Sequence, residues 1–128
     1  AVVSLDGGVF FSFPTDDPGE ENDSDVGLEY IMVSPDTFEA FTRVPMLLIY
    51  GDNIPTERHD IYELDVWRIR LGLARQWADA VNRRGGDVTV IHLPEIGIKG
   101  NTHFLMSDLN NTEVADIILK WLHKKGMD

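Results

Sequence analysis

Residues 44–52, VPMLLIYGD, decide the fold class of this chain. The stretch is a continuous apolar run that ends at a glycine and an aspartate. Continuous apolarity, without alternating polar residues, is typical of a strand that is buried on both of its faces. We therefore expect residues 44–50 to form an interior strand of a sheet.

The flanking segments extend this strand into a layered α/β unit. Residues 1–6 and 87–93 also have the composition of strands, and residues 64–84 carry apolar side chains at helical spacing, with Gly85-Gly86 as a terminator. A second apolar helical stripe follows residues 110–112, which we expect to cap that helix. Buried strands that alternate with helices predict an α/β fold with a mainly parallel sheet flanked by helices.

An acidic insertion separates the first two predicted strands. Residues 9–43 begin with the aromatic run VFFSFP and continue with TDDPGEENDSDVGLE, and the first Lys or Arg of the chain is Arg43. We expect a solvated segment that acts as a cap or lid within a single domain, of which residues 1–128 form the C-terminal portion.

Charge and composition exclude several classes of function. The chain has 11 Lys and Arg residues against 22 Asp and Glu residues, a net charge of −11, which disfavours binding to nucleic acids and anionic membranes. It contains no cysteine, so thiolate catalysis and disulfides are excluded. No apolar run approaches the roughly 20 residues that a membrane span needs.

Three polar side chains follow the predicted strands closely enough to form a site. Ligands of open parallel sheets bind beyond the carboxyl ends of the strands. Asp6 and Asp52 each follow a strand, and His103 lies in the loop GNTHFLMSDLNN, which precedes the last helix. A histidine and a carboxylate at one sheet edge form the downstream half of a nucleophile–histidine–acid triad. These positions alone also fit a structural histidine and leave the choice of acid open.

The sequence from residue 44 to the end, about two thirds of the chain, resembles the C-terminal part of a branch of bacterial and fungal α/β-hydrolase-fold serine esterases. The segments VPMLLIYGDNIP and GGDVTVIHLPEIGIKGNTHFLMSDLNNTEVADIILKWL carry this resemblance. It implies that His103 is the triad histidine. It also aligns AVVSLDGG with the strand that follows the nucleophile and so makes Asp6 the triad acid, with Asp52 as the alternative.

Departures from the esterase pattern point to the substrate pocket. The family loop typically reads GNSHM, whereas this chain reads GNTHF. We expect Phe104 and Met106 to shape the pocket, together with Phe10 and Phe11 of the insertion. The resemblance implies a small-molecule ester substrate and requires no metal ion or organic cofactor.

The nucleophile of such an esterase is not present in this sequence. None of the serines lies in a G-x-S-x-G motif, which in this fold precedes the strand that AVVSL resembles. We therefore expect the serine on an N-terminal chain of the same precursor, produced by proteolytic processing and held non-covalently in a heterodimer.

Other functions on the same fold remain open at this point. The alternatives are a non-catalytic α/β-hydrolase-like binding protein, and a lyase or C–C hydrolase that uses the same pocket. The location is also open. The sequons at Asn22 and Asn110 and the frequent export of similar esterases favour an extracytoplasmic location.

Overall fold

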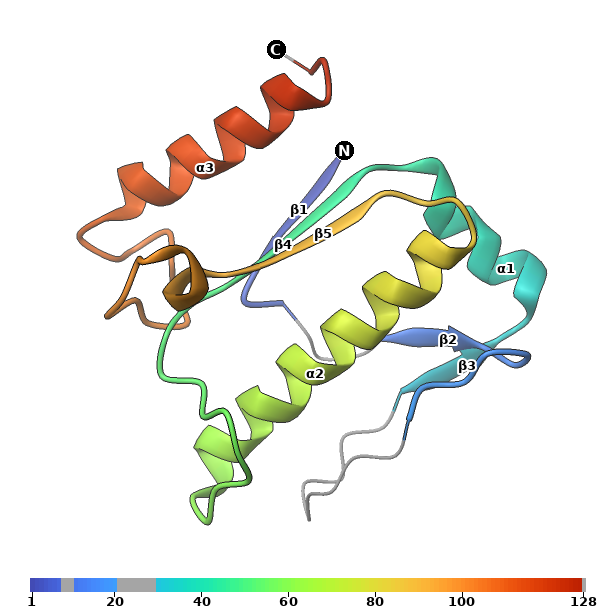
Figure 1. Ribbon diagram of the computed structural model, residues 1–128, viewed down its shortest axis with the longest axis horizontal. Coiled ribbons are helices and arrows are strands. Elements are labelled where there is room, and N and C mark those ends of the chain that lie inside the picture. The colour runs from blue at the N-terminus through green and yellow to red at the C-terminus, as the bar shows by residue number, and fades with distance from the viewer. Residues whose placement is uncertain (8–10, 21–29, 128) are drawn as a thin grey trace.

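A three-stranded parallel sheet forms the centre of the chain. The computed structural model describes residues 1–7, 11–20 and 30–127 (Figure 1). Strands β1 (Val2–Leu5), β4 (Met46–Tyr50) and β5 (Val88–His92) lie in the order β1-β4-β5, and both neighbouring pairs are parallel. The predicted mainly parallel α/β fold is confirmed.

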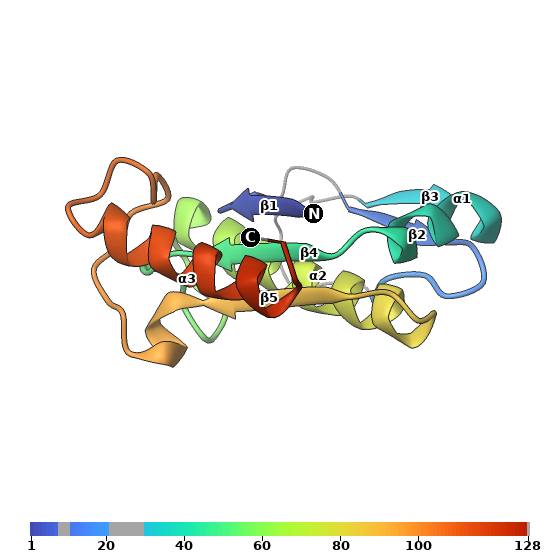
Figure 2. The same cartoon turned by 90° about the horizontal axis from the view of Figure 1, so that it is seen from above.

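Two helices cover the opposite faces of this sheet. Helix α2 (Tyr62–Arg83) packs on one face and helix α3 (Asn111–Lys124) on the other, as Figures 1 and 2 show. All five residues of β4 are buried, and they divide between the two faces with the period of two that a strand imposes. Met46, Leu48 and Tyr50 belong to the cluster that includes α2, and Leu47 and Ile49 to the one that includes α3.

Both helices begin and end close to the predicted positions. Helix α2 begins two residues before the predicted start, and the apolar stripe of residues 71–81 is buried against the sheet. Helix α3 begins after Asn110, but the Asn110 side chain makes no capping hydrogen bond. The amide group of Asn110 pairs instead with Asn101 in the preceding loop.

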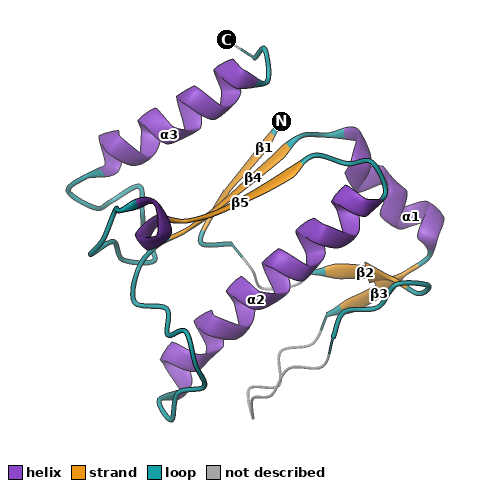
Figure 3. Ribbon diagram, in the orientation of Figure 1, coloured by secondary structure: helices purple, strands orange, loops and turns teal. Residues whose placement is uncertain are grey.

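The described parts of the acidic insertion are folded, contrary to a purely solvated loop. They contain a small parallel pair, β2 (Ser12–Pro14) and β3 (Ile31–Val33), followed by α1 (Pro35–Glu39) and the 3-10 turn η1 (Ala40–Arg43), as Figure 3 shows. Despite its acidic composition, the insertion contains two fully buried aromatic side chains, Phe13 and Phe38, which pack in the core beside α2. Whether the insertion acts as a lid stays a prediction.

Strand β1 is more exposed than the buried strand that its composition predicts. It pairs with β4 along one edge, and no other described strand pairs with its second edge. Val2 and Val3 consequently keep 48% and 36% of their surface exposed.

The carboxyl ends of all three strands meet at one edge of the sheet because the strands are parallel. The chain leaves β5 through the 3-10 turn η2 (Leu93–Ile96) and then returns to the end of β4. There the Asp52 N–H donates to the carbonyl of Asn101 at 3.1 Å. Residues 100–110, the histidine loop, are thus held over the carboxyl edge of the sheet.

Candidate active site

Asp6 occupies a tight turn directly after β1. Its backbone has φ of +44°, in the left-handed region that Asp adopts more readily than most residues other than glycine. In this conformation its two carboxylate oxygens accept the Gly51 N–H at 3.0 and 3.2 Å. The turn thereby places a buried carboxylate at the end of β4.

His103 lies beside this carboxylate. Its Nδ1 is 3.7 Å from Oδ2 of Asp6, longer than a hydrogen bond, and the two side chains are 22% and 1% exposed. Nδ1 is itself buried and has no hydrogen-bond partner within the described part of the chain. A closer approach of a few tenths of an ångström would let Nδ1–H donate to Asp6, as a histidine–acid pair requires.

Burial raises the pKa of the Asp6 carboxyl above its ordinary value. The Gly51 N–H and the nearby His103 act in the opposite direction. Among the described residues Gly51 is the one backbone donor to this buried carboxylate, so a positive charge on the adjacent imidazole is its natural counterion. The pair is therefore suited to stabilising a protonated histidine.

Tyr50 stabilises the turn after β1 from the α2 face of the sheet. Its hydroxyl donates to the carbonyl of Gly7 at 2.7 Å and fixes the chain just beyond Asp6. Burial and the charge of Asp6 both raise the pKa of the Tyr50 phenol, so the hydroxyl stays a donor.

Trp67 contacts His103, the other residue of the Asp6–His103 pair. Its ring stacks on the imidazole of His103, with 3.8 Å between the centroids and 12° between the planes. The guanidinium of Arg70, one helical turn further along α2, lies 4.6 Å from the Trp67 ring centroid. Trp67 is the first residue of the apolar stripe predicted within residues 64–84, and its helical spacing favours a place in the core and does not reveal that the ring faces a loop.

Four polar residues of the histidine loop form a closed hydrogen-bond network. Asn101 is 1% exposed, and its side-chain amide pairs reciprocally with that of Asn110. Asp108 accepts from the Asn101 amide and from both the N–H and the hydroxyl of Thr102. These bonds, with that of Asn101 first, lower the pKa of Asp108. These hydrogen bonds therefore hold together the loop segments on either side of His103.

Gly51 makes the close approach between this loop and β4 feasible. A Cβ atom at this position would lie 2.4 Å from the carbonyl oxygen of Thr102 and 3.1 Å from Oδ2 of Asp6. Real Cβ atoms do not approach backbone oxygens so closely, so no larger residue fits without displacing the histidine loop.

Asp52, the alternative acid, has a different set of contacts. Its carboxylate accepts the N–H of Gly100 at 2.7 Å and that of Asn53 at 2.7 Å. These backbone donors, Gly100 first, lower the pKa of Asp52. Asp52 therefore anchors the start of the histidine loop, while Asp6 is the carboxylate that lies next to the imidazole.

The residues expected to form the substrate pocket differ in their exposure and contacts. Phe104 and Met106 are 69% and 56% exposed on the loop that carries His103, which leaves them free to contact a ligand. Phe11 instead packs into the core, with its ring centroid 5.7 Å from that of Trp77. Phe10 lies outside the described residues.

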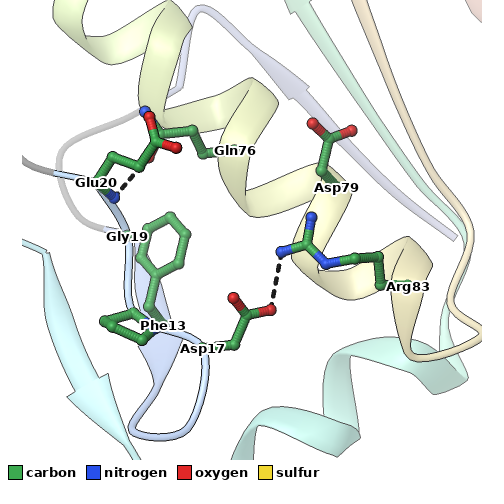
Figure 4. A pocket seen from close by; sticks show the side chains of 8 residues that line it. Phe13, Asp17, Gly19, Glu20, Gln76, Asp79 and Arg83 are labelled. Carbon is green, nitrogen blue, oxygen red and sulfur yellow. Dashed lines mark hydrogen bonds and ion pairs between the residues drawn. The ribbon is translucent and has the colours of Figure 1, made fainter.

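Two of the cavities lined by described residues border α2, and neither of these two is lined by His103 or Asp6. Figure 4 shows the first, of about 140 Å³, where Arg83 donates to Asp17 and Gln76 accepts from the Glu20 N–H. The second, of about 280 Å³, is lined by residues that include His92 and Glu95. Among the described residues, no group of three His, Asp or Glu side chains is arranged to hold a metal ion.

No helix in the described part of the chain combines the length and the apolar character needed to cross a bilayer.

Comparison with known proteins points to esterases and lipases. No family model matches the chain. Over 48 residues, or 38% of its length, it is 40% identical to a probable secreted lipase, phiG, of a fungal species. Its structure matches that of a bacterial esterase known at atomic resolution with a TM-score of 0.59 and 34% identity, over 73% of this chain.

These matches span 13% of the lipase and 27% of the esterase, so the chain corresponds to a minor part of either relative. Within that part, the chain is related to esterases and lipases, and its parallel sheet flanked by helices is esterase-like.

Proposed function

We propose that this chain supplies the histidine and the acid of a serine hydrolase that acts on carboxylic esters. The observation that carries the proposal is the pairing of His103 with a buried Asp6 at the carboxyl edge of a parallel sheet. The relationship to a bacterial esterase and a secreted lipase supports the choice of ester chemistry.

In the proposed reaction, His103 acts through Nε2 as a general base. It takes the proton of a serine hydroxyl while the oxygen attacks the ester carbonyl, and it then returns the proton to the departing alkoxide. The resulting acyl-enzyme is cleaved by water, with His103 again accepting a proton. Asp6 holds Nδ1–H and stabilises the imidazolium that forms in each step.

The serine of this reaction belongs to a segment outside the 128 residues, because the sequence contains no G-x-S-x-G motif. We place it on the predicted N-terminal chain of the same precursor. The exposed apolar edge of β1 supports this assignment, since a further parallel strand would pair with its backbone and cover Val2 and Val3.

The location that fits the proposal is extracytoplasmic. The related fungal lipase is described as secreted, and the sequons at Asn22 and Asn110 favour the same location.

Ester turnover by the full protein tests the proposal. Hydrolysis of a panel of acyl esters should be detectable, and His103→Gln should lower kcat by about 10³-fold or more with little change in KM. His123→Gln, on the exposed surface of α3, is the matched control and should leave turnover unchanged. Turnover that survives His103→Gln would refute the assignment, and products of C–C cleavage or elimination would move it to another reaction class.

A further inference from the structure

Trp67 is the side chain that most directly limits how the imidazole of His103 can move. The two rings are nearly parallel, 12° between planes, and their centroids are 3.8 Å apart. An imidazole held in this way cannot rotate about its χ2 torsion without losing the stack. The indole therefore fixes the plane in which Nδ1 and Nε2 lie.

This plane matters because the two nitrogens have different tasks. Nδ1 has to point toward Asp6, 3.7 Å away, so that Nε2 points away from the carboxylate, toward the place of the reacting serine. Asp6 alone does not fix the ring, since its distance to Nδ1 exceeds that of a hydrogen bond. The stacked indole provides the missing restraint.

Stacking also favours the charged form of the histidine. The face of an indole carries negative electrostatic potential, and Trp is the side chain that attracts cations most strongly in this way. An imidazolium on this face is stabilised more than a neutral imidazole. His103 acquires its positive charge in the transition state of the proposed reaction, so the contact strengthens as the reaction proceeds.

We propose that Trp67 is a positioning residue for His103, which orients the imidazole and stabilises its protonated form during ester hydrolysis. This inference rests on the proposed function for its catalytic consequence. The contact itself, and its effect on the protonation of His103, can be measured independently of turnover.

Asp6 is the charged group that lies next to the imidazole, 3.7 Å from Nδ1, and its carboxylate favours the imidazolium. The other titratable groups at this edge of the sheet are Asp52 after β4, His92 at the end of β5 and Asp108 in the histidine loop. Arg70 on α2 lies 4.6 Å from the Trp67 ring centroid. Substitutions of Trp67 leave all of these charges in place, so they isolate the contribution of the indole.

The test compares Trp67→Leu with Trp67→Phe in the full protein. Leu removes the aromatic face, whereas Phe keeps a smaller one. We expect Trp67→Leu to lower kcat on the order of tenfold at constant KM and to move the acid limb of the kcat/KM profile to lower pH. Trp67→Phe should lose at most about threefold. Tyr62→Leu, an exposed aromatic substitution on the same helix, is the control and should match the wild type.

A second measurement does not depend on turnover. Protonation of a stacked imidazole quenches indole emission, so part of the fluorescence of the wild-type protein should change with pH, and that part should be absent in both His103→Gln and Trp67→Phe.

The outcomes separate the two proposals. A pH-dependent emission that requires His103, in a protein without ester turnover, would sustain the contact and refute the function. Wild-type kinetics and pH profile in Trp67→Leu, or equal losses in Trp67→Leu and Trp67→Phe, would overturn the positioning role.

Discussion

Oδ2 of Asp6 lies 3.7 Å from Nδ1 of His103, although 97 positions separate the two residues in the sequence. Two local features create this proximity. The left-handed turn at Asp6 directs the carboxylate toward the end of β4, and the missing side chain of Gly51 lets the histidine loop descend onto that end. The candidate site thus depends on both β1 and the loop after β5.

Asp6, and not Asp52, should be the acid on which turnover depends. Asp6→Asn removes the charge but keeps the shape, so we expect kcat to fall by about 10³- to 10⁴-fold, as it does when a triad acid is neutralised. Asp52→Asn removes one anchor of the histidine loop and should cost roughly tenfold or less. Steady-state kinetics of the two variants decide the point, and a larger loss in Asp52→Asn would reverse the assignment.

Gly51→Ala should displace the histidine loop. The new Cβ would meet the Thr102 carbonyl oxygen at 2.4 Å, so we expect the free energy of unfolding to fall by about 1–3 kcal/mol and turnover to fall with it.

Gly72→Ala provides the matched control for this steric effect. A Cβ at Gly72, in the interior of α2, would meet nothing within 4 Å and should stabilise the helix by about 0.5–1 kcal/mol. Urea unfolding measures both changes. A Gly51→Ala protein as stable and active as the wild type would contradict the close approach.

The raised pKa of Asp6 predicts a specific dependence of stability on pH. Because the folded state binds this proton more tightly than the unfolded state, Asp6 contributes stability below its unfolded pKa of about 4 and loses it as pH rises through the folded value. Asn at position 6 does not titrate. As pH increases from about 3 to 7, the free energy of unfolding of Asp6→Asn should therefore rise relative to that of the wild type. A constant difference, or one of opposite sign, would show that the folded-state pKa is not raised.

Asp108 should control the order of the histidine loop. Its carboxylate accepts three hydrogen bonds from Asn101 and Thr102, so Asp108→Ala should speed amide exchange at Thr102 and Phe104 and lower kcat by about tenfold. Glu113→Ala, an exposed acid in the first turn of α3, is the control and should change neither quantity. Unchanged exchange at Thr102 in Asp108→Ala would show that the network does not hold the loop.

The sheet, both long helices and the position of His103 follow from the sequence because local patterns determine them. Residues 44–50 are apolar throughout since β4 is covered on both faces, and Asp6 follows a strand of the same sheet. The parallel arrangement alone then brings strand-end residues to one edge. The resemblance to esterases was needed to prefer Asp6 to Asp52, and the geometry now places Asp6 beside the imidazole.

The remaining features depend on contacts between distant segments, which composition does not reveal. The acidic insertion appeared solvated because its charges outnumber the two buried rings, Phe13 and Phe38, that anchor its described parts. Trp67 matched a core stripe, and its contact with His103 becomes apparent only when the histidine loop returns over α2. Phe11 was expected in the pocket and instead packs against Trp77, because the insertion folds back on the helix.

The central claim is that His103 and Asp6 activate a serine that lies outside these 128 residues. Labelling of the full protein by a fluorophosphonate, followed by mass spectrometry of its peptides, tests this claim most directly. We predict that one serine outside this sequence, within a G-x-S-x-G motif, is labelled, and that His103→Gln slows its labelling by about 10³-fold. An unlabelled wild-type protein, or equal labelling in His103→Gln, would contradict the account.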